Sequence, residues 1–358
     1  MRPTDEQLHA RRAAVGRTIA HDDLDGLVVT TLVNVRYLSG FTGSNGALLL
    51  RPDGSGTFVT DGRYRDQAAH EVPGLDHVVE RDMVAALASR TAGRWGVETH
   101  TMSVETHSTL SAATDAELVA VDRPVERARE TKDDAEVASL REACAISTAA
   151  LEGLLSGPLV GRTEQDLARD LEWRMLGLGA EAIAFETILA SGENSAIPHH
   201  HPSDREVATG DLLKIDFGAR VDGYHADCTR TVVVGHADDW QREVHAAVRR
   251  AQTLGVRALR EDAPVAEIDV AVRADLEDSG WLEHFTTGLG HGVGLLIHED
   301  PFFSARHAGR LGRRTTLTME PGIYVPGRGG VRIEDTVLVT ADEPDVLTAL
   351  TTELLEIV

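Results

Sequence analysis

Four carboxylates of this chain stand inside apolar, strand-like stretches, where acidic side chains are uncommon. Asp216 lies in LLKIDFGA, Asp227 precedes the β-branched run of DCTRTVVVG, Glu320 lies in LTMEPGIYV and Glu334 in GVRIEDTVLV. Because burying a carboxylate without a partner costs several kcal/mol, acids in such settings need a counter-charge. The sequence therefore predicts that these acids serve a common binding site.

Turn signals between the acids predict how they come together. Asp222-Gly223 separates the first two acids and the sequence GRGG separates the second two, and both are typical of hairpins. Each hairpin would then carry a pair of acids on adjacent strands. Four gathered carboxylates repel one another unless cations neutralise them, and two divalent ions balance four negative charges.

His291 is a candidate fifth ligand, in the stretch TTGLGHGVGL. Its flanking glycines allow the backbone to approach a site closely. An oxygen-rich set with one imidazole favours Mn, Co or Fe, and Zn also fits. A water shared by two ions loses a proton near neutral pH and can attack a carbonyl. Taken singly, each acid fits a surface or capping carboxylate and His291 fits a loop histidine, so the paired arrangement is what points to a metal site.

Helices and strands of two different parts must position these groups. Up to about residue 122, apolar runs at 27–30, 47–50 and 57–60 predict strands, and the spacing over 81–91 predicts a helix. After a break at Pro124 and a run rich in charge, longer helices are expected, with strands between and after them. The helices are predicted at 133–155, 163–177, 239–258 and 265–278, and the strands at 212–217, 229–234 and 331–339. We therefore expect an α/β domain over residues 1–125 and an α+β domain over residues 126–358.

Composition excludes several classes of function. The 358 residues suggest about two domains, and 42% hydrophobic with 26% charged residues excludes wholesale disorder. A formal net charge of −23 opposes binding to nucleic acid or to anionic lipid surfaces. The longest aliphatic stretch, Val84–Ala88, is too short to span a bilayer. The amino-terminal stretch has no apolar signal region, and two cysteines make no disulfide framework, so we expect a cytoplasmic protein.

The order and context of the five candidate ligands resemble the pita-bread metallopeptidases, which include methionine aminopeptidases, Xaa-Pro aminopeptidases and prolidases. Two further strings resemble the proline-specific branch and its creatinase-type leading domain. The resemblance implies a creatinase-like α/β domain followed by a pita-bread α+β catalytic domain. The matching strings are KIDFGARVDGYHADCTRT, GLGHGVGLLIHEDP, TMEPGIYVPG and GGVRIEDT, and, for the proline-specific branch, VNVRYLSGFTGSNGALL and SGENSAIPHHHPSDR.

The resemblance also implies a role for each candidate ligand. Asp216 and Asp227 match ligands of a first divalent metal ion, and His291 and Glu320 match ligands of a second. Asp227 and Glu334 match the residues that bridge the two ions. We expect Mn as the metal, with Co, Fe or Zn as alternatives.

Catalytic roles follow from the same resemblance. His199 matches a histidine that contacts the substrate and stabilises the tetrahedral intermediate, and His298 matches one that binds near the scissile carbonyl. Glu320 matches the group that also shuttles a proton. Arg332 matches an arginine that orients the bridging carboxylates from behind.

Five nearby residues are predicted not to be ligands. His200 and His201 are expected in a solvent-exposed loop, and His225 in the wall of the site. Cys228 should point away from Asp227 because neighbouring strand residues alternate in direction. Tyr324 could line the pocket, but packing in the core is the interpretation we favour.

The expected activity is hydrolysis of the bond between an amino-terminal residue and a following proline, by a Xaa-Pro aminopeptidase acting on Xaa-Pro peptides. A Xaa-Pro dipeptidase with the same mechanism is the nearest alternative. Phe302 stands where relatives often carry a basic residue that would hold a dipeptide's carboxylate, although Arg306 could substitute. A metal-free creatinase-like hydrolase and a non-enzymatic binding module are further alternatives, which the intact ligand set disfavours. The resemblance also implies a homodimer.

Overall fold

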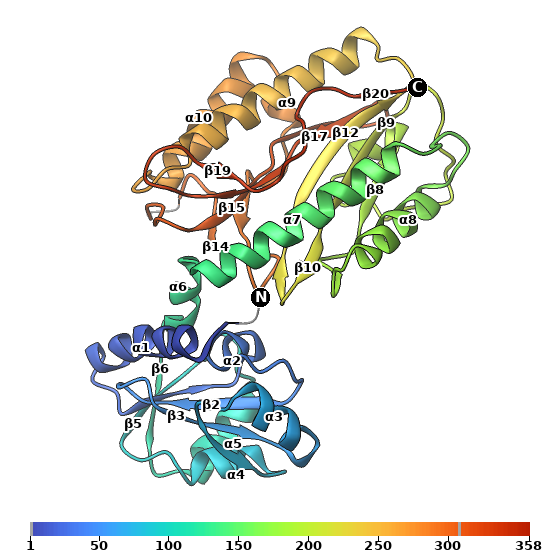
Figure 1. Cartoon of the computed structure of the whole chain (residues 1–358). Coiled ribbons are helices and arrows are strands. Elements are labelled where there is room, and N and C mark those ends of the chain that lie inside the picture. Colours follow the sequence, from blue (N-terminus) through green and yellow to red (C-terminus); the bar gives the residue numbers. More distant parts are fainter. Residues whose placement is uncertain (1–2, 307–308) are drawn as a thin grey trace. The chain divides into compact units, whose positions relative to one another are not determined.

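A computed structural model of the chain describes residues 3–306 and 309–358 (Figure 1). It divides into two compact units, of which one ends at Arg129 and the other begins at Glu130. The domain boundary that the sequence places between residues 125 and 126 stays a prediction. Among the described residues, no helix combines the length and the apolar character needed to cross a membrane.

The amino-terminal unit is built on a six-stranded mixed sheet with strand order β4-β3-β2-β1-β5-β6. The three strands predicted from apolar runs are present as β1, β2 and β3, and the predicted helix is present in part as α4. Buried aliphatic side chains on both faces of β1 and β2 explain why these strands read as continuous apolar runs. The strands are β1 (Gly26–Val29), β2 (Gly46–Leu50), β3 (Gly56–Thr60), β4 (Asp76–Val79), β5 (Arg94–Val97) and β6 (Glu117–Ala120). The helices are α1 (Asp5–His21), α2 (Leu32–Ser39), α3 (Arg65–Glu71), α4 (Met83–Ala88), α5 (Val104–Ala113) and α6 (Pro124–Glu130).

Four long helices of the carboxy-terminal unit agree with the predicted ones. Asp133 closes a capping box with Glu136 at the start of α7. At the start of α8, Thr163 accepts a hydrogen bond from the backbone of Asp166, but the shorter Asp side chain makes no return bond. The helices are α7 (Asp134–Leu155), α8 (Glu164–Gly177), α9 (Asp239–Ala258) and α10 (Val265–Asp278).

Short strands lie between two helix pairs in this unit (Figure 1). Helices α7 and α8 pack against β7, β8, β10 and β11, whereas α9 packs against β15, β16 and β17. The main core joins α9 and α10 to the last strands through residues such as Val248, Val272, Leu317 and Ile323. The strands are β7 (Ala182–Ile183), β8 (Ile188–Ser191), β9 (Leu212–Phe217), β10 (Ala219–Val221), β11 (Tyr224–His225), β12 (Cys228–Val234), β13 (His291–Gly292), β14 (Glu299–Phe302), β15 (Thr316–Met319), β16 (Gly322–Val325), β17 (Gly329–Arg332), β18 (Asp335–Leu338), β19 (Asp345–Val346) and β20 (Glu356–Ile357).

The first predicted hairpin exists, but its ladder is interrupted beside the acids. Strands β9 and β12 pair as its outer part, and β10 and β11 continue the same register to the turn at Asp222-Gly223. At the break, Gly218 stands opposite Asp227. A Cβ on Gly218 would come within 1.8 Å of the carbonyl oxygen of Ala226, so only glycine fits this close approach. The break frees Asp227 from the ladder and turns it towards the site.

The second hairpin repeats this design. Strands β15 and β18 pair on one side of the break and β16 and β17 on the other, in one continuous register that sets Glu320 opposite Glu334. Pro321 has no N–H to give to a ladder at this point. The strand predicted over residues 331–339 is therefore two strands, β17 and β18, separated at Glu334. The backbone of Glu334 pairs instead with Thr229 of β12, which joins the two hairpins.

Candidate metal centre

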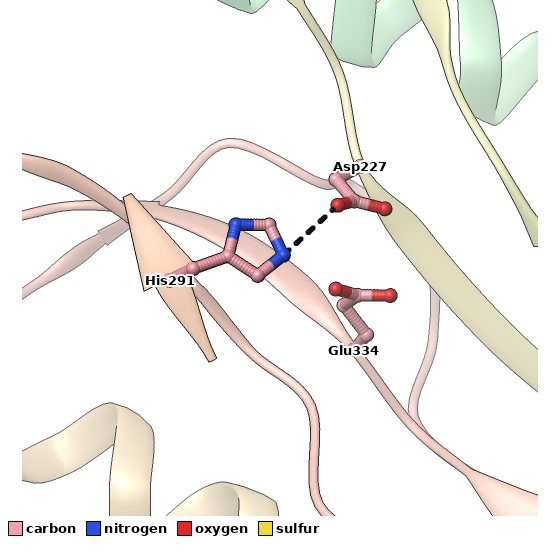
Figure 2. A group of neighbouring side chains, drawn as sticks. All are labelled: Asp227, His291 and Glu334. Carbon is pink, nitrogen blue, oxygen red and sulfur yellow. Dashed lines mark ion pairs between the residues drawn. The ribbon is translucent and has the colours of Figure 1, made fainter. Parts of the chain in front are cut away.

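Three of the five candidate ligands form one tight cluster. Donor atoms of Asp227, His291 and Glu334 all lie within 4.8 Å of one another, and all three residues are buried. They come from three places in the fold: the loop before β12, the start of β13, and the break between β17 and β18 (Figure 2). Nε2 of His291 lies 3.6 Å from Oδ2 of Asp227. Three potential ligands from separate segments thus converge on one point.

Backbone contacts fix the orientation of His291. Its Nδ1 lies 3.0 Å from the carbonyl oxygen of Gly292, which can only accept a hydrogen bond, so Nδ1 carries the proton. Its backbone N–H donates to Thr318. Burial lowers the pKa of His291 to about 4, which keeps the ring neutral near pH 7. The lone pair on Nε2 therefore faces the carboxylates, as a metal ligand requires.

Thr229 holds both the backbone and the side chain of Glu334. The N–H of Glu334 donates to the carbonyl oxygen of Thr229, and the Thr229 hydroxyl donates to Oε2 of Glu334 over 2.7 Å. Burial raises the pKa of Asp227 well above its usual value, and the charge of Glu334 raises it further. Burial likewise raises the pKa of Glu334, reinforced by the charge of Glu320. The anionic form of either acid is therefore unfavourable unless a cation lies beside it.

Glu320 joins the cluster through His291. Its Oε1 lies 3.4 Å from Nε2 of His291 and 3.4 Å from the Thr318 hydroxyl. Burial raises the pKa of Glu320 to about 7, so in the absence of a cation its carboxyl exchanges a proton near neutral pH.

Asp216 occupies the side of the site next to Arg332. It pairs with Thr229 across the ladder, so it shares a face with Asp227, which lies two residues before Thr229. Nη2 of Arg332 donates to Oδ2 of Asp216, whereas Oδ1 is buried without a hydrogen-bond partner. The guanidinium also donates to the hydroxyls of Thr229, over 3.0 Å, and Tyr324, over 2.7 Å. Arg332 thereby aims one carboxylate oxygen away from itself and into the site.

These features fit divalent metal ions. An orphaned buried oxygen on Asp216 and a lone pair of His291 turned towards carboxylates are costly in the protein alone. Carboxylate oxygens and one neutral imidazole are the ligands that Mn, Co and Fe accept. Cations at this place would remove the mutual repulsion of the acids. They would also coordinate the unpaired carboxylate oxygen and the imidazole lone pair. The residues present therefore suit the group that the sequence predicts.

One cavity of about 770 Å³ opens onto the cluster. All five candidate ligands line it, as do His199 and His298. The rings of His298 and His291 are 4.4 Å apart at a near-perpendicular angle. Burial lowers the pKa of His298, and the charge of His199 adds to this effect. The structure thus places both predicted catalytic histidines on the cavity wall, whereas Arg332 lies buried behind the ligands.

The prediction for His200 is wrong, whereas that for His201 is confirmed. His201 is exposed, with 89% of its side chain accessible. His200 is instead largely buried, and its Nε2 lies 2.7 Å from Oε2 of Glu164. A buried acid at the start of α8 captures this ring, which no local sequence signal indicates.

The other three non-ligand predictions have mixed outcomes. Tyr324 is buried against Arg332, as the favoured packing interpretation expected. Cys228 is buried, with its thiol 3.4 Å from the carbonyl oxygen of Phe217, and burial raises its pKa well above the usual value. His225 contacts the carbonyl oxygen of Gly294 and is not among the cavity-lining residues, so the wall position predicted for it is wrong.

Sequence analysis missed three residues that organise this site. Thr229 links Asp216, Glu334 and Arg332 through its hydroxyl and backbone. Glu164 accepts hydrogen bonds from the backbone and hydroxyl of Ser191, among others. Lys214 lies within an apolar strand, and this placement is the one signal that could have drawn attention to it.

The chain is similar to known peptidases in sequence and in fold. The chain is 34% identical to a Xaa-Pro dipeptidase of Pyrococcus furiosus, over 93% of this chain and 96% of that protein. Among solved structures, a Xaa-Pro dipeptidase from Bacillus anthracis superposes with a TM-score of 0.93 at 34% identity, covering 97% of this chain and 99% of that one. An X-Pro aminopeptidase from Thermotoga maritima gives 0.88 at 32% identity, covering 93% and 97%.

Family models assign both units of the chain. The model of the creatinase/prolidase N-terminal domain matches residues 11–131, and that of metallopeptidase family M24 matches residues 138–341. The predicted fold, a creatinase-like domain followed by a pita-bread catalytic domain, is confirmed. The chain belongs to metallopeptidase family M24, whose members are hydrolases that use divalent metal ions.

Proposed function

We propose that this metallopeptidase is a Xaa-Pro dipeptidase, which hydrolyses the bond between a residue and a carboxy-terminal proline. The observation that carries the proposal is the cluster of buried, unneutralised ligands at the base of a single cavity. Among the relatives, those named Xaa-Pro dipeptidase support this alternative better than the aminopeptidase that we expected from the sequence.

The cavity wall suits a proline ring. A Xaa-Pro bond has no N–H, and the ring fixes φ, so a site for it needs an apolar surface instead of a hydrogen-bond acceptor. Apolar side chains of the described lining supply that surface: Phe185, Ile188, Ile297, Phe302 and Phe303. A cavity of this kind would hold the ring by its shape and by exclusion of water.

Each residue of the site then has its own role in hydrolysis. When bound by Asp216, Asp227, His291, Glu320 and Glu334, a pair of divalent ions would supply an activated water and polarise the scissile carbonyl. Glu320 would take up the proton that the attacking water loses and pass it to the leaving proline nitrogen. His199 and His298, on the cavity wall, donate hydrogen bonds to the substrate and to the negative charge that develops on its carbonyl oxygen.

A Xaa-Pro aminopeptidase is the second candidate. Among the described residues, the cavity lining contains no lysine or arginine, and Phe302 is part of that lining. A dipeptide exposes its carboxylate one residue from the scissile bond and would gain most from such a cation. The apolar lining at this point therefore favours longer substrates.

Substrate length separates the two candidates. We would measure kcat/KM of the metal-loaded enzyme for Ala-Pro, Ala-Pro-Ala and a longer Ala-Pro-led peptide, each with Mn, Co and Zn. A dipeptidase cleaves Ala-Pro at least about tenfold better than the longer peptides, a difference of about 1.4 kcal/mol. Faster cleavage of the longer peptides would establish the aminopeptidase instead, and no cleavage of any would refute both.

Three finer expectations belong to this proposal. Mn²⁺ is the proposed metal, because four of the five ligands are carboxylates, and competition between Mn and Zn for the metal-free protein tests it. A homodimer is proposed, and sedimentation at micromolar concentration tests it. Both cysteines are buried and unpaired, which supports the proposed reducing, cytoplasmic location.

A further inference from the structure

Lysine is confined to two places in this chain. The sequence has 35 basic residues, and only Lys132 and Lys214 are lysines, the rest being arginines. Both are buried, with 1% and 0% of their surface exposed. Lysine is ordinarily among the most exposed residues, so its restriction to buried positions indicates a specific task for each amine.

Lys214 secures the segment that leads into His199. It extends from β9, and its Nζ donates to the carbonyl oxygens of Ile197, over 2.6 Å, and Pro198, over 3.2 Å. The carbonyl of Pro198 and the N–H of His199 belong to the same planar peptide unit. Holding this carbonyl therefore fixes the peptide plane from which the His199 side chain departs. An amine donates these bonds whether or not it is protonated.

Lys132 secures the segment that carries His298. Its Nζ donates to Oε1 of Glu299 over 2.7 Å, and Glu299 directly follows His298 at the start of β14. The second oxygen of Glu299 accepts a hydrogen bond from the backbone of Leu296. The buried pair thus anchors the chain on both sides of His298, across 167 positions of sequence.

Both histidines depend on the neighbouring backbone for their position. Both His199 and His298 line the cavity with exposed side chains outside regular helices and strands. A ring that is exposed on one side is not enclosed by close packing, so its position depends largely on the backbone beneath it. A buried lysine binds the carbonyl of Pro198, the residue before His199. The other buried lysine binds the carboxylate of Glu299, the residue after His298.

We propose that Lys214 and Lys132 are positioning residues, Lys214 for His199 and Lys132 for His298. The proposal rests on the Xaa-Pro hydrolysis proposed above, in which these histidines contact the substrate. Neither lysine lines the cavity, so neither is in place to contact the substrate directly.

The space around both amines is confined. A Cβ on Gly294 would lie 2.4 Å from Oε1 of Glu299 and 3.2 Å from Cε of Lys132, so the backbone of Gly294 closes one side of this pair. Lys214 is enclosed by the ring of Tyr324, 5.1 Å from its Nζ, and by the loop whose carbonyls it holds. A compact amine on a slender stem fits both sites.

Double-mutant cycles on kcat with Ala-Pro test the proposal. K214M and K132M should each lower kcat about 10- to 100-fold, the cost of a misplaced catalytic group. On the His199→Ala background, K214M should lower kcat by less than about 2-fold further, and K132M should behave likewise on His298→Ala. The crossed pairs, K214M with His298→Ala and K132M with His199→Ala, serve as matched controls and should multiply. Equal effects in the direct and crossed pairs would overturn the proposal.

A second measurement needs no substrate. In hydrogen exchange followed by mass spectrometry, K214M should speed amide exchange around residues 197–201 and leave residues 294–300 unchanged, and K132M should do the reverse. No local change, or faster exchange throughout, would refute the positioning role. If the wild-type protein cleaved no Xaa-Pro peptide, the proposed function would fail, and this exchange pattern alone would decide the role of the lysines.

Folding and metal loading are controlled separately. If K132M does not fold because it removes the buried positive charge beside Glu299, K132M/E299Q removes both charges. If K214M does not fold, K214Q retains one donor. Metal content is measured for every variant, and loss of metal in K214M would show that Lys214 supports Asp216, two residues away, rather than His199.

Discussion

Two regions of the molecule bury carboxylates in opposite ways. In the amino-terminal unit, Glu98 is fully buried, and its oxygens accept hydrogen bonds from the backbones of Thr30 and Thr31 and from the side chain of Asn34, over 2.7–3.0 Å. In the metal centre, Oδ1 of Asp216 has no partner, and the carboxylates of the cluster chiefly face one another and His291.

The difference separates a structural acid from a functional one. Burial raises the pKa of Glu98, but the donors around Glu98 favour its anion and oppose that effect. At the metal centre, neighbouring acids add to the effect of burial. Buried acids with few hydrogen-bond donors around them are therefore candidate metal ligands. Buried acids that accept several hydrogen bonds stabilise the fold.

Replacing Asp227, a member of the buried cluster, should have the largest effect. Asp227→Asn keeps the shape of the side chain but removes a charge, so it should lower kcat/KM by about 1000-fold, since metal catalysis supplies several kcal/mol. The same variant, stripped of metal, should be more stable than stripped wild type because repulsion is relieved. Steady-state kinetics and thermal unfolding in a chelator check the two effects, and a chelated variant less stable than wild type would contradict this account of the cluster.

Removing the metal should make stability depend on pH. The pKa of Glu320 in the metal-free fold is raised to about 7, so the stabilisation of its protonated form is complete below the ordinary pKa and is lost as pH rises through about 7. Asp227 and Glu334 shift in the same direction. The Tm of chelated protein should fall by several degrees between about pH 5 and about pH 8. Protein saturated with Mn²⁺ is the control, and equal slopes with and without metal would argue against a cation at this place.

Arg332→Lys should have an intermediate effect. The variant keeps a positive charge but cannot contact Asp216, Thr229 and Tyr324 together. Outer contacts of this kind change metal affinity by about 10- to 100-fold. Titration of the metal-free protein with Mn²⁺ measures the loss, and an unchanged affinity would mean that Asp216 needs no orientation.

Glu98→Gln should have the smallest effect on activity. Its amide cannot accept from every donor that now faces the carboxylate, so the protein should lose about 1–3 kcal/mol of stability. The kcat and metal content per folded molecule should stay at wild-type values. Urea unfolding and kinetics measure both, and a large loss of metal would erase the distinction between the two kinds of buried acid.

Local patterns predicted the elements that carry the site. The long helices have strong apolar periodicity and caps such as Asp133, and the two hairpins have turn signals that pin their register. The breaks inside the hairpins escaped prediction, because they depend on close approaches that only the fold creates, such as that of Gly218 to Ala226. The prediction of one continuous strand over 331–339 was wrong for the same reason.

Contacts between distant segments account for the rest. His200 was expected in a solvent-exposed loop, yet Glu164 binds it from 36 positions earlier. The pairing of Lys132 with Glu299 is likewise invisible to any local window. The candidate ligands could be named because their residue types are unusual in apolar strands, whereas the residues that orient them look ordinary in sequence.

The confinement of lysine to buried positions also governs how the protein reacts with amine-directed reagents. In the described structure neither ammonium group reaches the surface, so succinimidyl esters should leave lysine side chains of the folded chain unmodified. Unfolding would expose both at once. Acylation of Lys132 and Lys214 would therefore report unfolding of the carboxy-terminal unit. The native protein, with both lysines unmodified, would serve as the control.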